Sequence, residues 1–328
     1  MYRIDPHLHL GGTIFPDAIW DILQITKQYY LASDLEDVKK QVMFASDEPK
    51  EFHRFLNKFR LLDSINWNEQ AIDRSIQSVS NYLIKQGLDY TWIDFSINKY
   101  MGIGWHKHEA IQFIYDRFNT YIPDRFGLVL SIKYETSLTH QISYTKLLEH
   151  EVSELLFGID WVGDEAYFDG SVYPPIFKEW ASAGKMVRVH AGESQFANNV
   201  VQAINAGATN VAHGFKILGN VSAMDLALDK DITLDMSLIS NRMTGVFQRL
   251  DHPIIGLLRY GIKTTLGSDD PVQFDSSLDK ELEYASNIGL DRQELYKISK
   301  TAFDNTIRFL KSQNKAIPAH LRSMSAGY

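Results

Sequence analysis

The stretch Gly184–His213, GKMVRVHAGESQFANNVVQAINAGATNVAH, contains the repeating unit that predicts the fold of this chain. Its short runs Met186–His190 and Asn210–His213 follow glycine-containing turns and have the composition of strands. The segment Ser194–Ala206 between them has the longer apolar spacing of a helix. A strand, a helix and a second strand in succession predict parallel strands with a helix packed on the sheet.

Runs of this strand type recur eight times, and amphipathic segments separate them. Strand and helix alternating eight times predict an α/β protein of the (β/α)8 TIM-barrel type. A doubly wound sheet for dinucleotides would carry Gly-x-Gly-x-x-Gly after its first strand, and the pair Gly11-Gly12 does not meet that pattern. The expected strands are Arg3–Leu10, Asp89–Ile97, Leu128–Tyr134, Leu155–Trp161, Met186–His190, Asn210–His213, Ile232–Met236 and Ile262–Leu266.

Glycines mark the expected helix ends. A helix commonly ends at a residue in the left-handed conformation, which glycine adopts without steric strain. We expect helices to end in this way, just before a strand, at Gly87, Gly127, Gly184, Gly207 and Gly261. Since no linker or internal repeat interrupts the pattern, residues 1–328 are predicted to form a single barrel domain.

The longest insertion, about Phe15 to Gln86, separates the first two expected strands and should contain extra helices. Within it, apolar residues spaced by three and four predict one apolar helix face. Two interpretations of this face stay open at this point: it packs on the barrel, or it forms a lid over the mouth of the barrel. The residues of the face are Phe52, Phe55, Leu56, Phe59 and Leu62.

The composition narrows the class of protein. The chain has 33 Lys and Arg against 41 Asp and Glu, and its formal net charge of −8 disfavours nucleic acid as a partner. No apolar run reaches the roughly 18 residues of a membrane span, and Met1–Leu10 does not resemble a signal peptide, so we expect a cytoplasmic protein without a membrane partner. The residues carry no indication of the oligomeric state.

Cysteine is absent from the chain. Its absence excludes disulfides, thiolate-bound zinc, iron–sulfur clusters and cysteine nucleophiles. Any bound metal must therefore be held by histidine or by a carboxylate.

Candidate ligands stand at the ends of four expected strands. His7 and His9 are two residues apart on a strand, so both imidazoles point to the same side. His190 and His213 close two later strands, and the doublet Asp269-Asp270 follows the last. Because the carboxyl ends of barrel strands converge on one mouth, these groups should meet there and form a metal site.

Three other groups of residues allow more than one interpretation. Glu193, three residues after His190, shares the cavity, is an acid at the N-terminus of a helix, or has both roles. Asp269-Asp270 either divides labour between metal and substrate or begins a turn before Pro271. His106 and His108 open a predicted helix, where residues two apart do not face each other, so we expect this pair to be solvated.

At these residues the sequence resembles the adenosine deaminase family of metal-dependent hydrolases, and the similarity runs in order from the first strand to the last. The matching motifs are His7-Leu8-His9-Leu10, Val189-His190-Ala191-Gly192-Glu193, Ala212-His213-Gly214 and Ser268-Asp269-Asp270-Pro271. Weaker similarity covers Gly158–Glu165, Ser240–Gly245 and Asn305–Leu310.

The resemblance implies hydrolytic deamination of a purine, with one zinc ion per chain. His7, His9, His190 and Asp269 would hold the zinc, which lowers the pKa of a water molecule toward about 7. Iron, cobalt or nickel also accept such ligands. Deaminases whose zinc is held by thiolates are excluded because the chain has no cysteine.

By the same resemblance, Asp269 and His213 would orient the attacking hydroxide. Glu193 would protonate the ring nitrogen beside the attacked carbon and shuttle protons until ammonia leaves. Asp270, neutral or sharing a proton, would contact the far ring nitrogen. Glu193, His213 and Asp269 would carry the reaction, and Asp270 would bind the substrate.

The remaining implied roles concern substrate binding. The backbone of Gly163 would hold the opposite side of the purine, and Ser96 would reach a sugar hydroxyl. The resemblance also favours the lid interpretation for Phe52, Phe55 and Leu56, because a lid excludes water from the chemistry beneath it.

Departures from the family pattern lie at the sugar end. Where adenosine deaminases carry an acid or amide that contacts the ribose 5′ hydroxyl, this chain has Gly11. The second strand lacks the usual Glu-x-Arg, and Ser237 and Leu238 replace a cysteine and a proline. Adenosine is the first candidate substrate, while free adenine, a 5′-substituted adenosine and an N6-substituted adenosine or AMP stay open.

Two hypotheses compete with deamination. Many barrel hydrolases that cut esters or cyclic amides bridge two metals through a modified lysine on the fourth strand, and Leu155–Trp161 contains no lysine. A barrel that binds a purine without turnover is also conceivable, since fold does not imply function. The presence of Glu193 argues against mere binding, because the acid is needed more for turnover.

Overall fold

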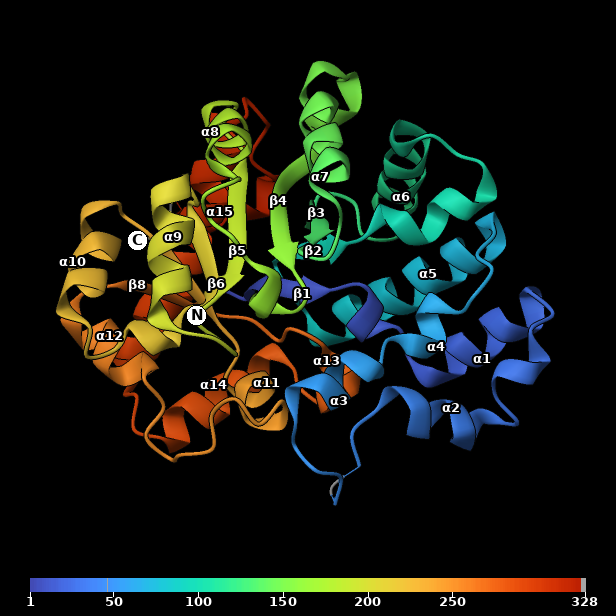
Figure 1. Ribbon diagram of the computed structural model, residues 1–328, viewed down its shortest axis with the longest axis horizontal. Helices are drawn as coiled ribbons and strands as arrows, with labels where there is room; N and C mark the ends of the chain where they lie inside the picture. Colours follow the sequence, from blue (N-terminus) through green and yellow to red (C-terminus); the bar gives the residue numbers. More distant parts are fainter. Residues whose placement is uncertain (46, 326–328) are drawn as a thin grey trace.

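The computed structural model describes residues 1–45 and 47–325. Its strands form one eight-stranded parallel sheet in the order β1-β2-β3-β4-β5-β6-β7-β8. A bridge between Leu8 and Asp269 joins the two ends of the sheet: the His9 amide donates to the Asp269 carbonyl, and the Asp269 amide donates to the His7 carbonyl, each at 2.8 Å. The prediction of a (β/α)8 TIM barrel is confirmed (Figure 1).

All eight expected strands are present, and their ends differ from the expected ones by at most two residues. Local strand composition explains why the strand positions were readable from the sequence. The strands are β1 Ile4–His9, β2 Tyr90–Phe95, β3 Phe126–Lys133, β4 Leu156–Val162, β5 Met186–Ala191, β6 Asn210–His213, β7 Thr233–Met236 and β8 Lys263–Leu266.

Helices surround the barrel, and the predicted extra helices after the first strand are present (Figure 1). The inserted helices are α1 Pro16–Ile25, α2 Leu35–Val42, α3 Phe52–Asn57, α4 Arg60–Asp63 and α5 Glu69–Gln86. The later ones are α6 Lys107–Tyr121, α7 Leu138–Thr145, α8 Pro174–Ser182, α9 Ala197–Ala206, α10 Val221–Asp229, α11 Leu238–Met243, α12 Ile254–Tyr260, α13 Pro271–Phe274, α14 Leu278–Asn287, α15 Arg292–Ser312 and α16 Ala319–Ser325.

Four of the five predicted glycine stops follow helices. Gly87, Gly207 and Gly261 are left-handed C-caps of α5, α9 and α12, and Gly184 follows α8 with a φ of +75°. The prediction for Gly127 was wrong, because this residue lies inside β3. A Cβ there would come within 2.8 Å of the Phe157 ring, so close packing on β4 accounts for this glycine.

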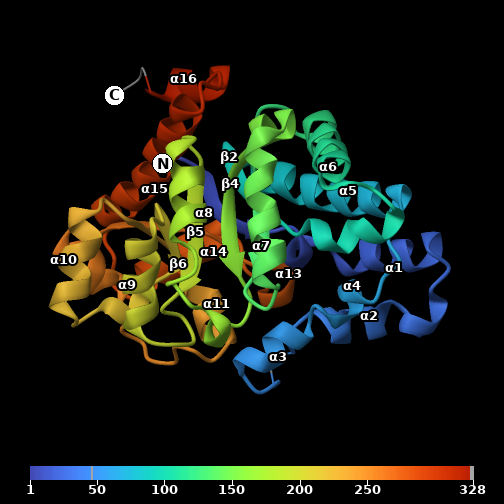
Figure 2. The same cartoon turned by 45° about the horizontal axis from the view of Figure 1, so that its top comes forward.

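The inserted helices flank one side of the barrel mouth. Helix α3 lies beside α13, which begins directly after the last strand (Figures 1 and 2). The Phe55 ring of α3 is 5.1 Å from the Phe274 ring of α13, centroid to centroid. Residues far apart in the sequence are thereby brought together over the carboxyl ends of the strands.

Aromatic side chains fill the opposite end of the barrel, where Trp92 and Phe157 pack on each other with centroids 5.0 Å apart and on Phe309 of α15. A small apolar cluster thus fills this end of the barrel, and the polar groups lie at the other end. Among the described residues, no helix combines the length and the apolar character that crossing a membrane requires.

Candidate active site

Four predicted metal ligands meet at the carboxyl ends of β1, β5 and β8. The Nε2 atom of His7 lies 3.1 Å from that of His9 and 3.2 Å from that of His190, and the Asp269 Oδ1 atom is 3.5 Å from His7 and 3.3 Å from His9. A tetrahedral ion with bonds of about 2.0–2.1 Å places its ligand atoms about 3.3 Å apart. The residues therefore fit a tetrahedral metal such as zinc.

Carboxylates beneath the cluster orient its ligands. The Nδ1 atom of His190 lies 3.1 Å from Asp160 Oδ1, which leaves Nε2 as the electron-pair donor toward the cluster. Buried Arg188 donates to Asp160 at 2.7 Å and also pairs with Asp94. On the β1 side, Asp5 accepts the Ser268 hydroxyl at 2.6 Å and fixes the residue before Asp269.

Glu193 lies beside this cluster and is buried. Burial, and next the Asp269 carboxylate, raise the pKa of Glu193 well above its usual range. Its Oε2 atom is 3.6 Å from His213 Nε2. A protonated carboxylic acid in a cavity is suited to donate a proton to a bound ring. Because α9 begins only at Ala197, the alternative of a helix-terminal acid was wrong.

The loop that carries Glu193 is held by a second buried acid, Glu165. The Glu165 carboxylate accepts the backbone N–H groups of four consecutive residues, Gly192, Glu193, Ser194 and Gln195, at 2.5–3.1 Å. These bonds hold the amides outside a helix, which explains why α9 starts later than the expected Ser194. Sequence reasoning gave Glu165 no role, although it closes the weakly matching segment Gly158–Glu165.

A chain of hydrogen bonds fixes the orientation of His213. His252 Nδ1 accepts the Ile254 amide, so its Nε2–H donates to Asn241 Oδ1 at 3.3 Å. The Asn241 amide nitrogen donates to His213 Nδ1 at 2.9 Å and to Glu193 Oε1 at 3.4 Å. The proton of His213 must then sit on Nε2, which faces Glu193. Burial lowers the pKa values of His213 and His252 to about 3, so both are neutral.

The sequence analysis missed Asn241 and His252. Asn241 lies in the weakly matching segment Ser240–Gly245, which was the available signal. His252 lies in a loop with no motif around it. Only the packing of α11 against the strand ends brings the two side chains together.

Asp270 faces the cavity from the opposite side. Both of its carboxyl oxygens are buried and have no hydrogen-bond partner among the described residues. Burial, and next the Asp269 charge, raise the pKa of Asp270 well above its usual range. Asp270 is the N-cap residue of α13, but its side chain makes no capping hydrogen bond, so the turn-forming interpretation leaves the carboxyl unexplained. A neutral, unpartnered acid is suited to bind a ring nitrogen.

Gly12 makes room for this acid. A Cβ at position 12 would fall 1.7 Å from the Asp270 Oδ1 atom, so no other residue fits there without moving the carboxyl. Gly12 of the pair Gly11-Gly12 therefore leaves space for a side chain of the site, although the pair does not match the pattern of a nucleotide-binding loop.

The predicted substrate-binding residues line the same cavity of about 220 Å³. Gly163 and Ser96 lie at the ends of β4 and β2, and Phe52, Phe55 and Leu56 face the cavity from α3. These three are only partly buried, while Phe55 also contacts Phe274. Helix α3 therefore both packs on the barrel wall and borders the cavity.

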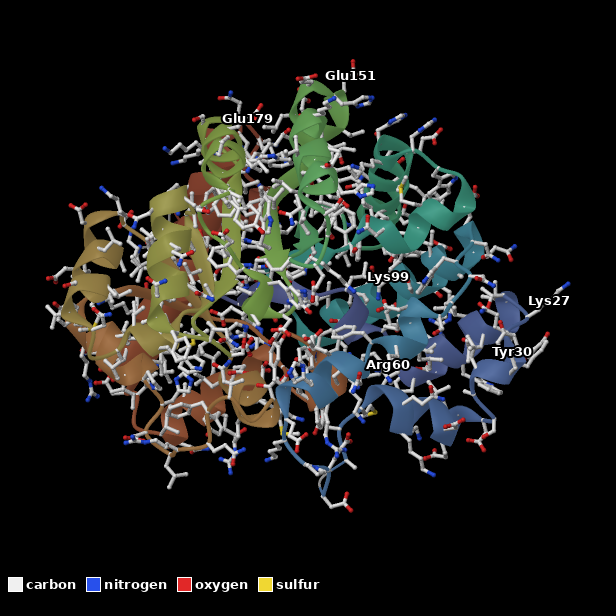
Figure 3. The ribbon with its side chains drawn as sticks, viewed as in Figure 1. Lys27, Tyr30, Arg60, Lys99, Glu151 and Glu179 are labelled. Atoms are coloured by element: carbon white, nitrogen blue, oxygen red, sulfur yellow. The ribbon has the colours of Figure 1, made fainter. Side chains whose placement is uncertain are left out.

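A charged cluster borders the outer end of this cavity. Lys99 Nζ is 3.0 Å from Asp63 Oδ1, and Lys133 Nζ is 3.6 Å from Asp63 Oδ2. Figure 3 shows Lys99 where the barrel strands meet the inserted helices, whereas Lys27 and Tyr30 project from the outer edge. The sequence analysis did not find this cluster, because its members lie on three separate segments.

His106 and His108 lie outside the metal-binding group. The His106 ring is exposed, caps the start of α6 and stacks on His108 at 5.6 Å between centroids.

A closed α/β barrel with a His/Asp group that could hold a metal ion, and with a buried acid beside it at the strand ends, is the arrangement expected of a barrel hydrolase. The family model for adenosine deaminase matches residues 3–317, and the chain belongs to the adenosine deaminase family. It is a hydrolytic deaminase that acts on an adenosine-type purine.

Relatives span nearly the whole chain. The adenosine deaminase of Photorhabdus laumondii is 31% identical over 294 residues, with 86% of each chain covered. That of Pectobacterium atrosepticum is 28% identical over 327 residues, which covers 95% of this chain and 93% of the relative.

Solved structures share the fold at lower identity. Adenine deaminase from Arthrobacter aurescens is 16% identical with a TM-score of 0.81 and 99% of each chain covered. The N6-mAMP deaminase of Arabidopsis is 17% identical with a TM-score of 0.83, covering 100% of this chain and 98% of that one. An amidohydrolase from Burkholderia ambifaria with bound Zn is 15% identical with a TM-score of 0.81, covering 99% of this chain and 92% of that one.

Proposed function

We propose that this protein uses one zinc ion per chain to hydrolyse the 6-amino group of an adenosine-type purine to a 6-oxo group, releasing ammonia, with adenosine as the first candidate substrate. The observation that carries the proposal is one cavity lined by the His/Asp group, by the neutral acid Glu193 and by the unpartnered acid Asp270. Attack on an aromatic amidine needs an activated water and an acid at the ring nitrogen, and this cavity offers the groups for both.

His7, His9, His190 and Asp269 would hold the metal. When bound, zinc supplies a Lewis acid that lowers the pKa of water enough for hydroxide to be available near neutral pH. Imidazole and carboxylate ligands also suit iron, cobalt and nickel. Elemental analysis of the protein as purified is expected to give one divalent ion per chain.

The protein groups divide the remaining work. Glu193 donates a proton to the ring nitrogen beside the attacked carbon, which removes aromaticity and lowers the barrier to attack. Neutral His213, with its proton on Nε2, orients the attacking oxygen and stabilises its charge. Asp270 donates to the far ring nitrogen, while the Gly163 backbone holds the opposite edge of the purine. Asp269 assists by accepting a hydrogen bond from the attacking water.

Several substrates share this ring chemistry, and Arabidopsis N6-mAMP deaminase and Arthrobacter adenine deaminase have the same fold. A panel of adenine, adenosine, 5′-substituted adenosines, AMP and N6-methyl-AMP tests the proposal, followed by release of ammonia, or of methylamine from N6-methyl-AMP. At least one compound should be deaminated by metal-replete protein. Failure with every compound would reject the proposal.

Two alternatives are tested separately. A barrel hydrolase with two metals bridged by a modified lysine is disfavoured, because β4 contains no lysine. Two metal ions per chain and cleavage of an ester or cyclic amide would favour it. A purine binder without turnover would bind the ring tightly but release no ammonia.

A further inference from the structure

The outer end of the cavity differs chemically from its inner end. A Cβ at Gly11 would lie 3.8 Å from Lys99 Nζ and 3.4 Å from the Phe59 ring. In adenosine deaminases an acid or amide at the position of Gly11 accepts a hydrogen bond from a sugar hydroxyl. This chain has the Lys99 ammonium beside that position, and an ammonium only donates hydrogen bonds. The polarity of the cavity at this point is therefore reversed.

Two ammonium groups share a single carboxylate there. Lys99 and Lys133 each approach a different oxygen of Asp63, so the triad carries one net positive charge. An ammonium has three N–H donors, and among the described residues Asp63 is the only ion-pair partner of either lysine. At least two donors on each lysine are thus available to a ligand.

The opposite charges of the triad support one another. Burial lowers the pKa of Lys99, and the Asp63 carboxylate opposes this shift. Burial works to raise the pKa of Asp63, but the two lysines outweigh it and the pKa is lowered. Lys99 is largely covered, with 17% of its side chain exposed, and its Nζ lies 5.7 Å from the centre of the Phe59 ring. A fixed, partly desolvated cation interacts more strongly with an anion than a solvated lysine does.

Two acids line the cavity on the ring side of this triad: Asp270, whose charge acts on Lys99, and Glu135. The Glu135 carboxylate accepts the Asp164 amide at 3.1 Å and lies against Gly163, where the purine edge is expected. Glu135 therefore belongs to the ring end of the cavity, and the outer end keeps its excess positive charge.

We propose that the substrate carries an anionic group, a phosphate ester or a carboxylate, on the sugar side of its adenine ring, and that Lys99 and Lys133 bind this group. Asp63 holds the two ammonium groups about the place where the anion binds, and also repels it. The proposal rests on the proposed function and specifies its substrate class as adenylate-type compounds.

The test compares adenine, adenosine, adenosine 5′-carboxylate and AMP as substrates of the metal-replete full chain. An anion-binding triad predicts a kcat/KM at least about tenfold higher for AMP or for the carboxylate than for adenosine, equivalent to about 1.4 kcal/mol. The two anionic substrates distinguish a phosphate from a carboxylate site. The preference should shrink as salt rises, because the ions screen the partly exposed Lys133.

Two variants separate charge recognition from structure. Lys99→Met should lower the ratio of kcat/KM for the anionic substrate to that for adenosine at least about tenfold, the same 1.4 kcal/mol. Asp63→Asn should raise the same ratio several-fold, because the competing carboxylate is removed while its shape is kept. If Asp63 has only a structural role, Asp63→Asn should instead lower kcat/KM for every substrate. Lys230→Met, at an exposed lysine that pairs with its neighbour Asp229, is the matched control.

The outcomes are distinguishable from failure of the proposed function. If adenine or adenosine is deaminated at least as well as AMP and the carboxylate, and Lys99→Met changes all substrates equally, the anion proposal is overturned while deamination stands. If no compound on the panel releases ammonia, the proposed function itself fails.

Discussion

The inner and outer walls of the cavity are built in different ways. The inner wall is built around the strand ends, and its groups are buried. Several of them are hydrogen-bonded to fixed neighbours, as His190 is to Asp160 and His213 is to Asn241 of α11. The outer wall combines side chains of the inserted helices with Lys99 and Lys133, which follow β2 and end β3, and these side chains are partly exposed. Phe55 and Lys133 belong to this second kind.

This difference assigns different tasks to the two walls. Groups fixed by buried bonds on rigid strands can be held within the small tolerances that proton transfer requires. Side chains on an inserted segment can change without disturbing those bonds, so they can select among substrates. We therefore expect changes in the inner wall to affect kcat or metal affinity, and changes in the outer wall to affect KM and substrate preference.

The largest effect is expected from Glu193→Gln. The amide keeps the shape of the acid but cannot donate the same proton, so kcat should fall by a factor of about 10²–10⁴. Metal content should be unchanged, because Glu193 is not a ligand. Ammonia release and elemental analysis on the same sample check both points. Turnover close to that of the parent protein would show that another group is the acid.

The Asp160→Asn variant tests whether the carboxylate that orients His190 contributes to metal binding. Losing the carboxylate that orients His190 should weaken metal binding by about 10–100-fold, with activity restored at high metal concentration. The measurement is a titration of chelator-treated protein with zinc, followed by activity. An unchanged metal affinity would contradict the division between the two walls, because the buried hydrogen bonds of the inner wall would then not contribute to metal binding.

A smaller effect is expected from the chain of bonds that ends at His213. His252→Phe keeps the ring contacts with Phe215 and Phe247, whose centroids lie 5.4 and 4.9 Å away, but removes the donor to Asn241. We expect kcat to fall about tenfold, or about 1.4 kcal/mol, with KM within about threefold.

His252→Gln restores a donor and should recover most of the lost rate. The nitrogen chemical shifts of His213 should show the Nε2–H form in the parent protein and in His252→Gln, and a mixture of forms in His252→Phe. If both variants lose the same activity and stability together, His252 only packs the loop.

The sequence predicted the inner wall well, for a physical reason. Strands have a period of two, and barrel strand ends converge, so His7, His9 and Asp269 could be placed at one mouth from local patterns. The predicted ligands lie close enough to one another to hold a metal ion. Their roles are tested by the variants proposed here. Glycine was a less reliable guide, since Gly127 serves strand packing rather than a helix end.

The outer wall and the supporting bonds could not be predicted from local patterns. Lys99, Asp63 and Lys133 approach each other only because the insertion folds back over β2 and β3. Glu165 acts through backbone amides, and His252 acts through Asn241. Such contacts leave no periodic pattern in the sequence. Long-range packing decides these positions, and it is absent from any single stretch of sequence.

The smallest effect is expected from Phe55→Ala in the outer wall. Removing the ring shortens the apolar wall over the cavity, so KM should rise about three- to tenfold, about 0.7–1.4 kcal/mol, with little change in kcat. Tyr30→Ala, which removes an aromatic ring that is 77% exposed on the same insertion, is the control and should change neither constant. If Phe55 served packing alone, the variant would unfold at lower temperature while its KM stayed at the parent value. A fall in kcat as large as that of His252→Phe would instead make α3 part of the catalytic wall, and the division between the two walls would have to be redrawn.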